Sequence, residues 1–137
     1  MPEVSGVLET ALHVEDVERS ARFYEDIFGF KRMASDERLC AFGVAGRDVL
    51  LLFKRGATLQ PVRLPGGVIP PHDGSGRMHF AFSIAAEEFE RWEKHLAAKG
   101  IPIESRVRWE LGGQSIYFRD PDQHLVELVT PGTWPIY

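Results

Sequence analysis

The stretch Ser115–Pro131, SIYFRDPDQHLVELVTP, decides how the rest of the chain is interpreted. It predicts a strand, a tight turn and a second strand. Pro121 sets φ at the second turn position, and the side chains of Asp120 and Asp122 can bond nearby backbone N–H groups. Glu127 lies in the second strand, within the apolar run LVELV. A buried carboxylate without a partner is costly, so Glu127 needs a metal ion, a cation or a proton.

The composition is that of one soluble domain, or of two half-domains that share a core. The chain has 137 residues, of which 44% are hydrophobic and 26% charged, and its net charge is −4. The basic residues are scattered, and no apolar run is long enough to span a bilayer, so we expect neither a nucleic-acid nor a membrane partner. No signal peptide is recognisable, and we expect a cytoplasmic location. Cys40 is the single cysteine, which excludes an internal disulfide, and its apolar neighbours favour a buried structural thiol.

The two halves of the chain repeat one pattern of a strand, a helix and further strands. In the first half the hydrophobic periodicity predicts a strand at Val7–Val14, a helix at Asp16–Phe28, and strands at Phe30–Met33, Leu39–Val44 and Asp48–Phe53. In the second half it predicts a strand at Met78–Ile84, a helix at Ala86–Lys99, and strands at Ile101–Ser105 and Arg106–Leu111, followed by the opening stretch. A sheet of this size must pair with another to enclose a core.

Between the halves, the stretch Gly56–Arg77 is rich in proline and glycine and predicts a connector without regular secondary structure. The expected organisation is an N-terminal βαβββ module at 1–57, a connector at 58–77, and a C-terminal βαβββ module with a tail at 78–137. We expect the tail to pack against the sheet or against a partner subunit. Within the turn of the opening stretch, His124 is expected to be solvated, and His72 in the connector is expected at the surface.

Three residues form a candidate metal site. Glu9 and His79 occupy equivalent places in the repeat, because each lies five residues before the apolar residue that ends its strand. Glu127 lies in the last strand of the second half, and its counterpart in the first half falls near Leu51. Two carboxylates and one imidazole suit a divalent metal ion with open coordination positions. The competing interpretation of Glu127 is an ion pair with Arg119 or with another arginine.

The chain resembles the vicinal oxygen chelate superfamily, which includes glyoxalase I, fosfomycin-resistance proteins, extradiol dioxygenases and bleomycin-resistance proteins. The resemblance covers nearly the whole chain and rests on three motifs: VEDVERSARFYEDIFGF at 14–30, HFAFSI at 79–84 and YFRDPDQHLVEL at 117–128. It implies an α+β fold in which two paired βαβββ modules form a curled, cup-shaped mixed sheet. It also implies a homodimer, in some members with the modules exchanged, so that Glu9 of one chain would join His79 and Glu127 of the other.

In this family the metal ligands lie in the first strand of each module and in the last strand, which implies Glu9, His79 and Glu127. The usual first ligand is His, so Glu9 is a departure, and His13 on the same face is the alternative. At a rise of roughly 3.3 Å per residue, the two Cα atoms lie about 13 Å apart. They therefore do not serve one ion equally well, and we favour Glu9. The ion is Mn²⁺, Zn²⁺, Ni²⁺, Mg²⁺ or Fe²⁺, with iron disfavoured because Glu9 makes the site harder.

The implied function is that of a divalent-metal-dependent lyase, isomerase or thiol transferase acting on a small oxygen-chelating substrate. Glu127 and Glu9 are the expected catalytic groups, and a carboxylate released from the metal would act as the base. The expected substrate contacts come from His13, Trp109, Tyr117 and Arg119, although strand alternation alone also explains Tyr117 and Arg119. A metal-free small-molecule binding protein, like the bleomycin-resistance proteins, is the alternative, and an extradiol-type dioxygenase the third possibility. An apolar Leu51 argues against a true glyoxalase I, which uses four protein ligands.

Overall fold

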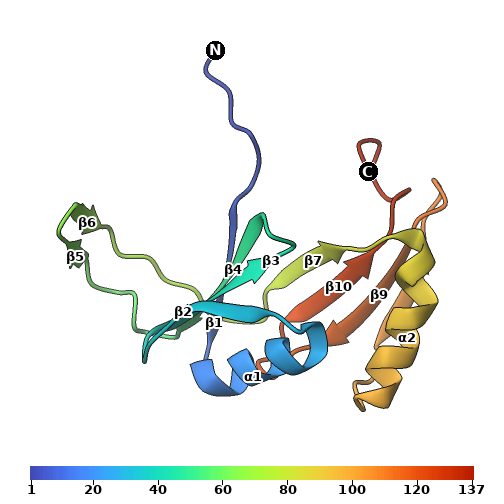
Figure 1. The fold of residues 1–137 in the computed structure, drawn as a ribbon, viewed down its shortest axis with the longest axis horizontal. Coiled ribbons are helices and arrows are strands. Elements are labelled where there is room, and N and C mark those ends of the chain that lie inside the picture. Colours follow the sequence, from blue (N-terminus) through green and yellow to red (C-terminus); the bar gives the residue numbers. More distant parts are fainter. The chain divides into compact units, whose positions relative to one another are not determined.

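The computed structural model describes residues 1–137 and divides the chain into two compact units, Met1–Gly76 and Arg77–Tyr137. Each unit contains a four-stranded mixed sheet and an α-helix that follows the first strand (Figure 1). This confirms the predicted α+β class and the repeat of two βαβββ modules.

Unit 1 has the sheet order β1-β4-β3-β2, in which β1 and β4 are parallel and the other neighbours antiparallel. Its elements are β1 (Glu9–Val14), α1 (Val17–Phe28), β2 (Lys31–Ser35), β3 (Leu39–Val44) and β4 (Asp48–Lys54).

The helix α1 begins and ends where the sequence predicts. The side chain of Asp16 caps its N-terminus by accepting the N–H of Arg19 at 3.0 Å, and Gly29 ends it with a left-handed φ of 68°. Its apolar stripe packs on one face of the sheet, where burial of Cys40 raises the pKa of that thiol. The buried side chains of this core are Leu12, Val14, Val17, Ala21, Tyr24, Ile27, Cys40, Phe42, Leu50 and Leu52.

Unit 2 repeats this topology with the sheet order β7-β10-β9-β8, in which β7 and β10 are parallel. Its elements are β7 (His79–Ser83), a 3₁₀ turn (Ala86–Glu88), α2 (Phe89–Ala98), β8 (Ser105–Arg108), β9 (Gln114–Arg119) and β10 (Leu125–Val129). Figure 1 shows α2 running alongside the sheet of this unit.

The strand registers of the two units are the same. Ala11 lies opposite Leu51 in unit 1, and Ala81 lies opposite Glu127 in unit 2. Leu51 is therefore the structural counterpart of Glu127, as the repeat predicts. Of these two equivalent positions, only the one in unit 2 holds a polar residue.

The predicted strand at Ile101–Ser105 is wrong. Residues 101–104 are irregular, and β8 begins only at Ser105. The N–H of Ile101 is still bonded to Leu96 of α2, and Pro102 has no N–H to offer a neighbouring strand. The chain therefore joins the sheet later than its β-branched residues suggest.

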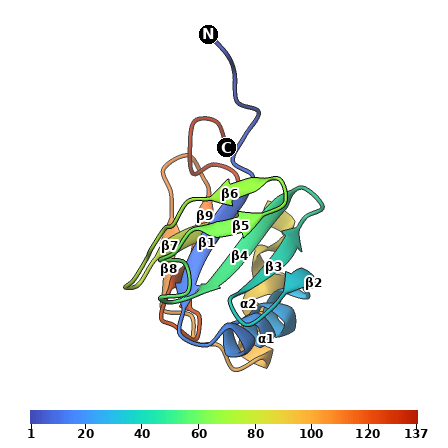
Figure 2. The same cartoon turned by 90° about the vertical axis from the view of Figure 1, so that its left-hand side faces the viewer.

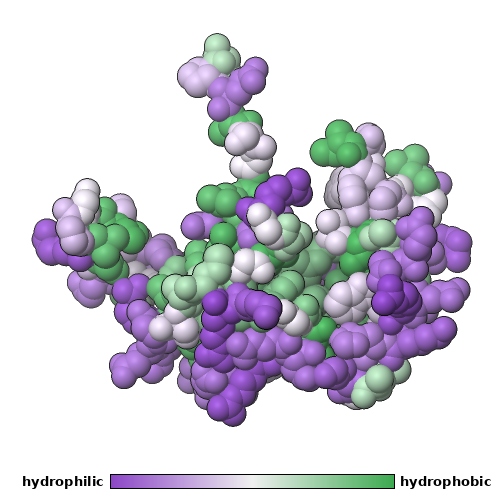
Figure 3. Space-filling model, in the orientation of Figure 1, coloured by the Kyte–Doolittle hydropathy of each residue, from purple (hydrophilic) through white to green (hydrophobic).

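The connector contains regular structure, contrary to our expectation. Two short strands, β5 (Val62–Leu64) and β6 (Gly67–Ile69), form an antiparallel hairpin across Pro65 and Gly66 (Figure 2). A Pro-Gly pair between alternating apolar residues is a hairpin signal, which the overall proline and glycine content conceals. The hairpin presents hydrophobic surface (Figure 3), contributed by the exposed side chains of Leu64, Val68 and Ile69.

The turn between β9 and β10 forms as predicted, but its histidine is buried. The side chain of Asp120 accepts the N–H groups of Asp122 and His124, both at 2.9 Å. His124 is fully buried, and its Nδ1 accepts the N–H of Met78 at 2.8 Å. The expectation of a solvated His124 is therefore wrong, because this imidazole ties the turn to the start of β7.

The C-terminal tail folds back onto its own sheet. The hydroxyl of Tyr137 lies 3.2 Å from the carbonyl oxygen of Val129 and 3.3 Å from that of Ile84, at the ends of β10 and β7. This agrees with the expected packing of the tail. No helix in either unit is long and apolar enough to cross a membrane.

An ion-pair cluster joins α1 to β2 and leads to a pH-dependent prediction. Arg32 contacts Glu18 at 2.8 Å and Glu25 at 2.6 Å. Its guanidinium lowers the pKa of Glu18 from 4.5 to about 2 and lowers the pKa of Glu25 as well. Because these folded-state pKa values are depressed, the cluster stabilises the fold above pH 4.5, and its contribution is lost as the pH falls toward 2.

We therefore expect Arg32→Met to lower the urea midpoint at pH 6, and the difference from wild type to shrink progressively below pH 4.5. Arg47→Met is the control, because Arg47 is exposed and lies 3.7 Å from Asp48. A difference between Arg32→Met and wild type that stays constant from pH 6 to pH 2.5 would contradict the role given to the two glutamates.

Candidate functional site

Polar side chains collect on one face of the sheet in unit 2. Because side chains alternate along a strand, His79 of β7, Tyr117 of β9 and Glu127 of β10 lie on the same face. The opposite face is apolar and buried, and its residues are Ile116, Phe118, Val126 and Leu128. The site is thus built from three adjacent strands that a hydrophobic core holds in place.

Glu127 is the centre of this group and is only 7% exposed. Its Oε1 accepts hydrogen bonds from the Ser115 hydroxyl at 2.5 Å and from the Tyr117 hydroxyl at 3.0 Å. Its Oε2 lies 3.3 Å from Nε2 of His79. Burial, together with the bond to Glu127 and the charge of that carboxylate, raises the pKa of Tyr117. Tyr117 therefore remains a neutral donor at physiological pH.

The contact of Nδ1 shows which ring nitrogen of His79 carries the proton. Nδ1 lies 3.0 Å from the backbone oxygen of Leu125, which can only accept, so Nδ1 carries the proton. In the neutral imidazole, Nε2 then presents a lone pair to Oε2 of Glu127. Two acceptor atoms that face each other need a cation or a further proton between them.

The separation of these two atoms fits a shared metal ion. Ligand atoms that each lie about 2.1 Å from one ion, at angles of about 90° to 110°, are about 3.0 to 3.4 Å apart. The Nε2–Oε2 distance of 3.3 Å falls in this range. The backbone bond of His79 is also the type of contact that orients metal-binding histidines. Neither unit brings a third His, Cys, Asp or Glu to this pair.

The remaining predicted residues of unit 2 have other partners. Arg119 binds Glu104 through Nε at 2.6 Å and through Nη2 at 3.2 Å, and this contact lowers the pKa of Glu104. The alternative of an ion pair between Arg119 and Glu127 is therefore wrong. Trp109 donates its indole N–H to the Ser115 hydroxyl at 2.8 Å. A contact of Arg119 or Trp109 with a substrate stays a prediction.

In unit 1, Glu9 and His13 lie on the same face of β1, as predicted. Glu9 is exposed at the start of the strand, whereas His13 is only 4% exposed. The His13 ring lies 5.8 Å from that of Phe53 and 5.5 Å from that of His72. The connector is held there by Thr58, which exchanges hydrogen bonds with the backbone of His72. The choice between Glu9 and His13 as the first ligand stays a prediction.

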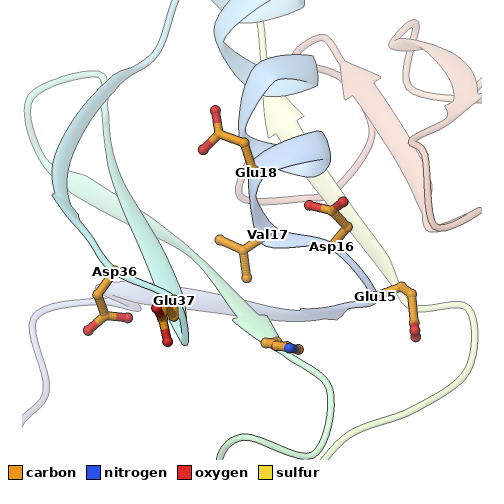
Figure 4. Close-up of a pocket in the computed structure, with 7 residues that line it drawn as sticks. Glu15, Asp16, Val17, Glu18, Asp36 and Glu37 are labelled. Atoms are coloured by element: carbon orange, nitrogen blue, oxygen red, sulfur yellow. The ribbon is translucent and has the colours of Figure 1, made fainter.

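Unit 1 also carries an acidic depression of about 510 Å³ between the start of α1 and the β2–β3 turn (Figure 4). Three of its five carboxylates have local structural roles. Asp16 caps α1, Glu18 binds Arg32, and Asp36 accepts the N–H groups of Arg38 and Leu39. We therefore assign it no part in the site.

Comparison with known proteins identifies the family. The model of the Glyoxalase/Bleomycin resistance protein/Dioxygenase superfamily matches residues 6–128. The chain belongs to this superfamily. This confirms the resemblance that the three sequence motifs indicate.

Several glyoxalase-superfamily relatives match along most of the chain. Metallothiol transferase FosB of Bacillus licheniformis is 32% identical over 129 residues, which cover 93% of this chain and 77% of that protein. Fosfomycin resistance protein FosX of Listeria innocua is 31% identical over 133 residues, which cover 91% of this chain and 89% of that protein. Among solved structures, lactoylglutathione lyase from Agrobacterium tumefaciens has a TM-score of 0.88 and 32% identity, over 98% of this chain and 99% of that chain.

The sequence analysis assigned no function to Ser115. A signal was nevertheless present, because Ser115 is a polar residue two positions before Tyr117 and therefore lies on the same strand face. Its contact with Glu127 follows from the antiparallel register, in which Tyr117 lies opposite Glu127 and Ser115 opposite Val129. The contact with Trp109 depends on a loop conformation that the strand pattern does not specify.

Proposed function

We propose that this glyoxalase-superfamily protein is a divalent-metal-dependent enzyme that catalyses a thiol-transfer or thiol-adduct reaction on a small oxygen-bearing substrate. The observation that carries the proposal is the apposition of Nε2 of His79 and Oε2 of Glu127 at 3.3 Å. Two relatives, a metallothiol transferase and a lactoylglutathione lyase, carry thiol chemistry in their names. The wider alternatives of lyase and isomerase share the same requirement for a metal.

His79 and Glu127 would hold the ion, with Glu9 as the proposed third ligand because it begins β1 as His79 begins β7. Bound there, the ion would act as a Lewis acid toward adjacent oxygens of the substrate. Within unit 2, the backbone oxygen of Leu125 fixes the tautomer of His79, and Ser115 and Tyr117 fix the carboxylate of Glu127. Tyr117 gives its single hydroxyl proton to Oε1 of Glu127, so toward a substrate near the metal its hydroxyl oxygen would act as an acceptor.

The test combines metal binding with a thiol assay. Protein purified without chelator, and protein reloaded with Mn²⁺, Zn²⁺ or Ni²⁺, is expected to bind about one ion per chain. Glutathione and cysteine would each be supplied as the thiol together with fosfomycin. In a separate assay, glutathione would be supplied together with methylglyoxal. We expect loss of free thiol to depend on the metal for one of these electrophiles. Metal content far below one ion per chain, with every ion tested, would contradict the proposal and favour a metal-free binding protein.

A further inference from the structure

The two oxygens of the Glu127 carboxylate have different environments. Oε1 accepts two hydrogen bonds, from Ser115 and Tyr117, and these use the lone pairs available in the carboxylate plane. Oε2 faces Nε2 of His79. The carboxylate is therefore held with one oxygen committed to the protein and the other directed toward the histidine.

The hydrogen bonds behind Oε1 form a chain with one direction. The indole of Trp109 can only donate, and it donates to the Ser115 hydroxyl at 2.8 Å. An ionised carboxylate can only accept, so the single proton of Ser115 is directed to Oε1 at 2.5 Å. Both ends of the chain thus fix the orientation of the serine hydroxyl, which has no proton left for another acceptor.

The donor at the start of this chain lies outside the strands. Trp109 follows β8 in the hairpin loop. There its backbone N–H donates to the carbonyl oxygen of Gly113 at 2.8 Å, and its backbone carbonyl accepts the N–H of Gly112 at 2.9 Å. The loop therefore sets the indole position, and Ser115, which is fully buried, transmits it to Glu127.

We propose that Trp109 and Ser115 are positioning residues that make Glu127 a ligand through Oε2 alone. This inference rests on the proposed metal-dependent function. A carboxylate whose Oε1 is occupied by two donors binds an ion with one oxygen and leaves a coordination position open for substrate. Without the hydrogen bonds that run from Trp109 through Ser115 to Oε1, the carboxylate can rotate and bind through both oxygens.

The test compares Ser115→Ala and Trp109→Phe with wild type and with Trp134→Phe, which removes a largely exposed indole of the tail. Each protein is first stripped of metal and checked by circular dichroism. Co²⁺ is then titrated by calorimetry, and the visible absorption of the Co²⁺ protein is recorded. Ser115→Thr, which keeps the hydroxyl, tests for rescue.

We expect Ser115→Ala to weaken Co²⁺ binding by about 10- to 100-fold, with a smaller loss for Trp109→Phe. Both variants should change the Co²⁺ absorption spectrum, because the coordination of Glu127 changes. Ser115→Thr should restore the affinity and the spectrum, and Trp134→Phe should match wild type. Folded Ser115→Ala and Trp109→Phe with wild-type affinity and spectrum would overturn the positioning role while leaving the proposed function intact. A wild-type protein that binds no Co²⁺ would overturn both.

Discussion

The variant Glu127→Gln is expected to lose metal binding and, with it, metal-dependent activity. The amide keeps the shape of the side chain but removes the negative charge that attracts a divalent ion. Changes to residues that merely orient a ligand weaken metal binding by about 10- to 100-fold, so removing the ligand charge itself should exceed that range. Calorimetric titration with Mn²⁺ or Zn²⁺ and the rate of thiol consumption measure the two effects.

His79→Ala should have a similar effect, because it removes the atom that faces Oε2 of Glu127 at 3.3 Å. Glu90→Gln is a matched control: it makes the same chemical change at an exposed position in the first turn of α2. Unchanged metal affinity in folded Glu127→Gln would show that the pair is not the metal centre. Equal losses in Glu90→Gln and Glu127→Gln would show that general charge, rather than ligation, is responsible.

The variant Gly113→Ala is expected to be strongly destabilised. A Cβ atom at position 113 would lie 2.6 Å from the backbone carbon of Gly132 and 2.7 Å from the hydroxyl oxygen of Thr133. The backbone segments at Gly113 and Gly132 are also joined by a hydrogen bond from the N–H of Gly113 to the carbonyl oxygen of Gly132, at 3.0 Å. Because backbone cannot move aside as a side chain can, we expect a loss of about 3 kcal/mol, at the upper end of overpacking effects.

Urea unfolding monitored by tryptophan fluorescence measures this loss. Gly66→Ala is the control, because a Cβ atom at position 66 would meet no atom within 4 Å and the residue has no positive φ. It should unfold within about 0.5 kcal/mol of wild type. A Gly113→Ala variant as stable as Gly66→Ala would mean that the segments at Gly113 and Gly132 are not packed together in solution.

The repeat could be predicted from the sequence because strong local patterns define it. The helix α1 has a capping aspartate, an apolar stripe and a terminal glycine, so its bounds were found closely. The equivalence of Leu51 and Glu127 also followed from strand alternation, since both strand registers are fixed by one buried face. The apposition of His79 and Glu127 was likewise expected from the resemblance to the family.

Other features depended on contacts between residues far apart in the sequence. His124 reads as a polar turn residue, yet it is buried because the N–H of Met78 needs an acceptor at that point. The chain from Trp109 through Ser115 to Glu127 depends on how a loop returns to the sheet. The competing interpretation, an ion pair between Arg119 and Glu127, is wrong because Glu104 lies beside Arg119 and binds it.

The strand order gives the two metal-binding candidates unequal freedom. β10 lies inside its sheet, whereas β7 is an edge strand bonded to β10 alone. The side chain of Glu127 is 10% exposed and that of His79 is 51% exposed. Edge strands open locally at lower cost than central ones. An ion would therefore first meet the half-exposed imidazole on the edge strand β7, and the carboxylate on the inner strand β10 would be its more rigid partner.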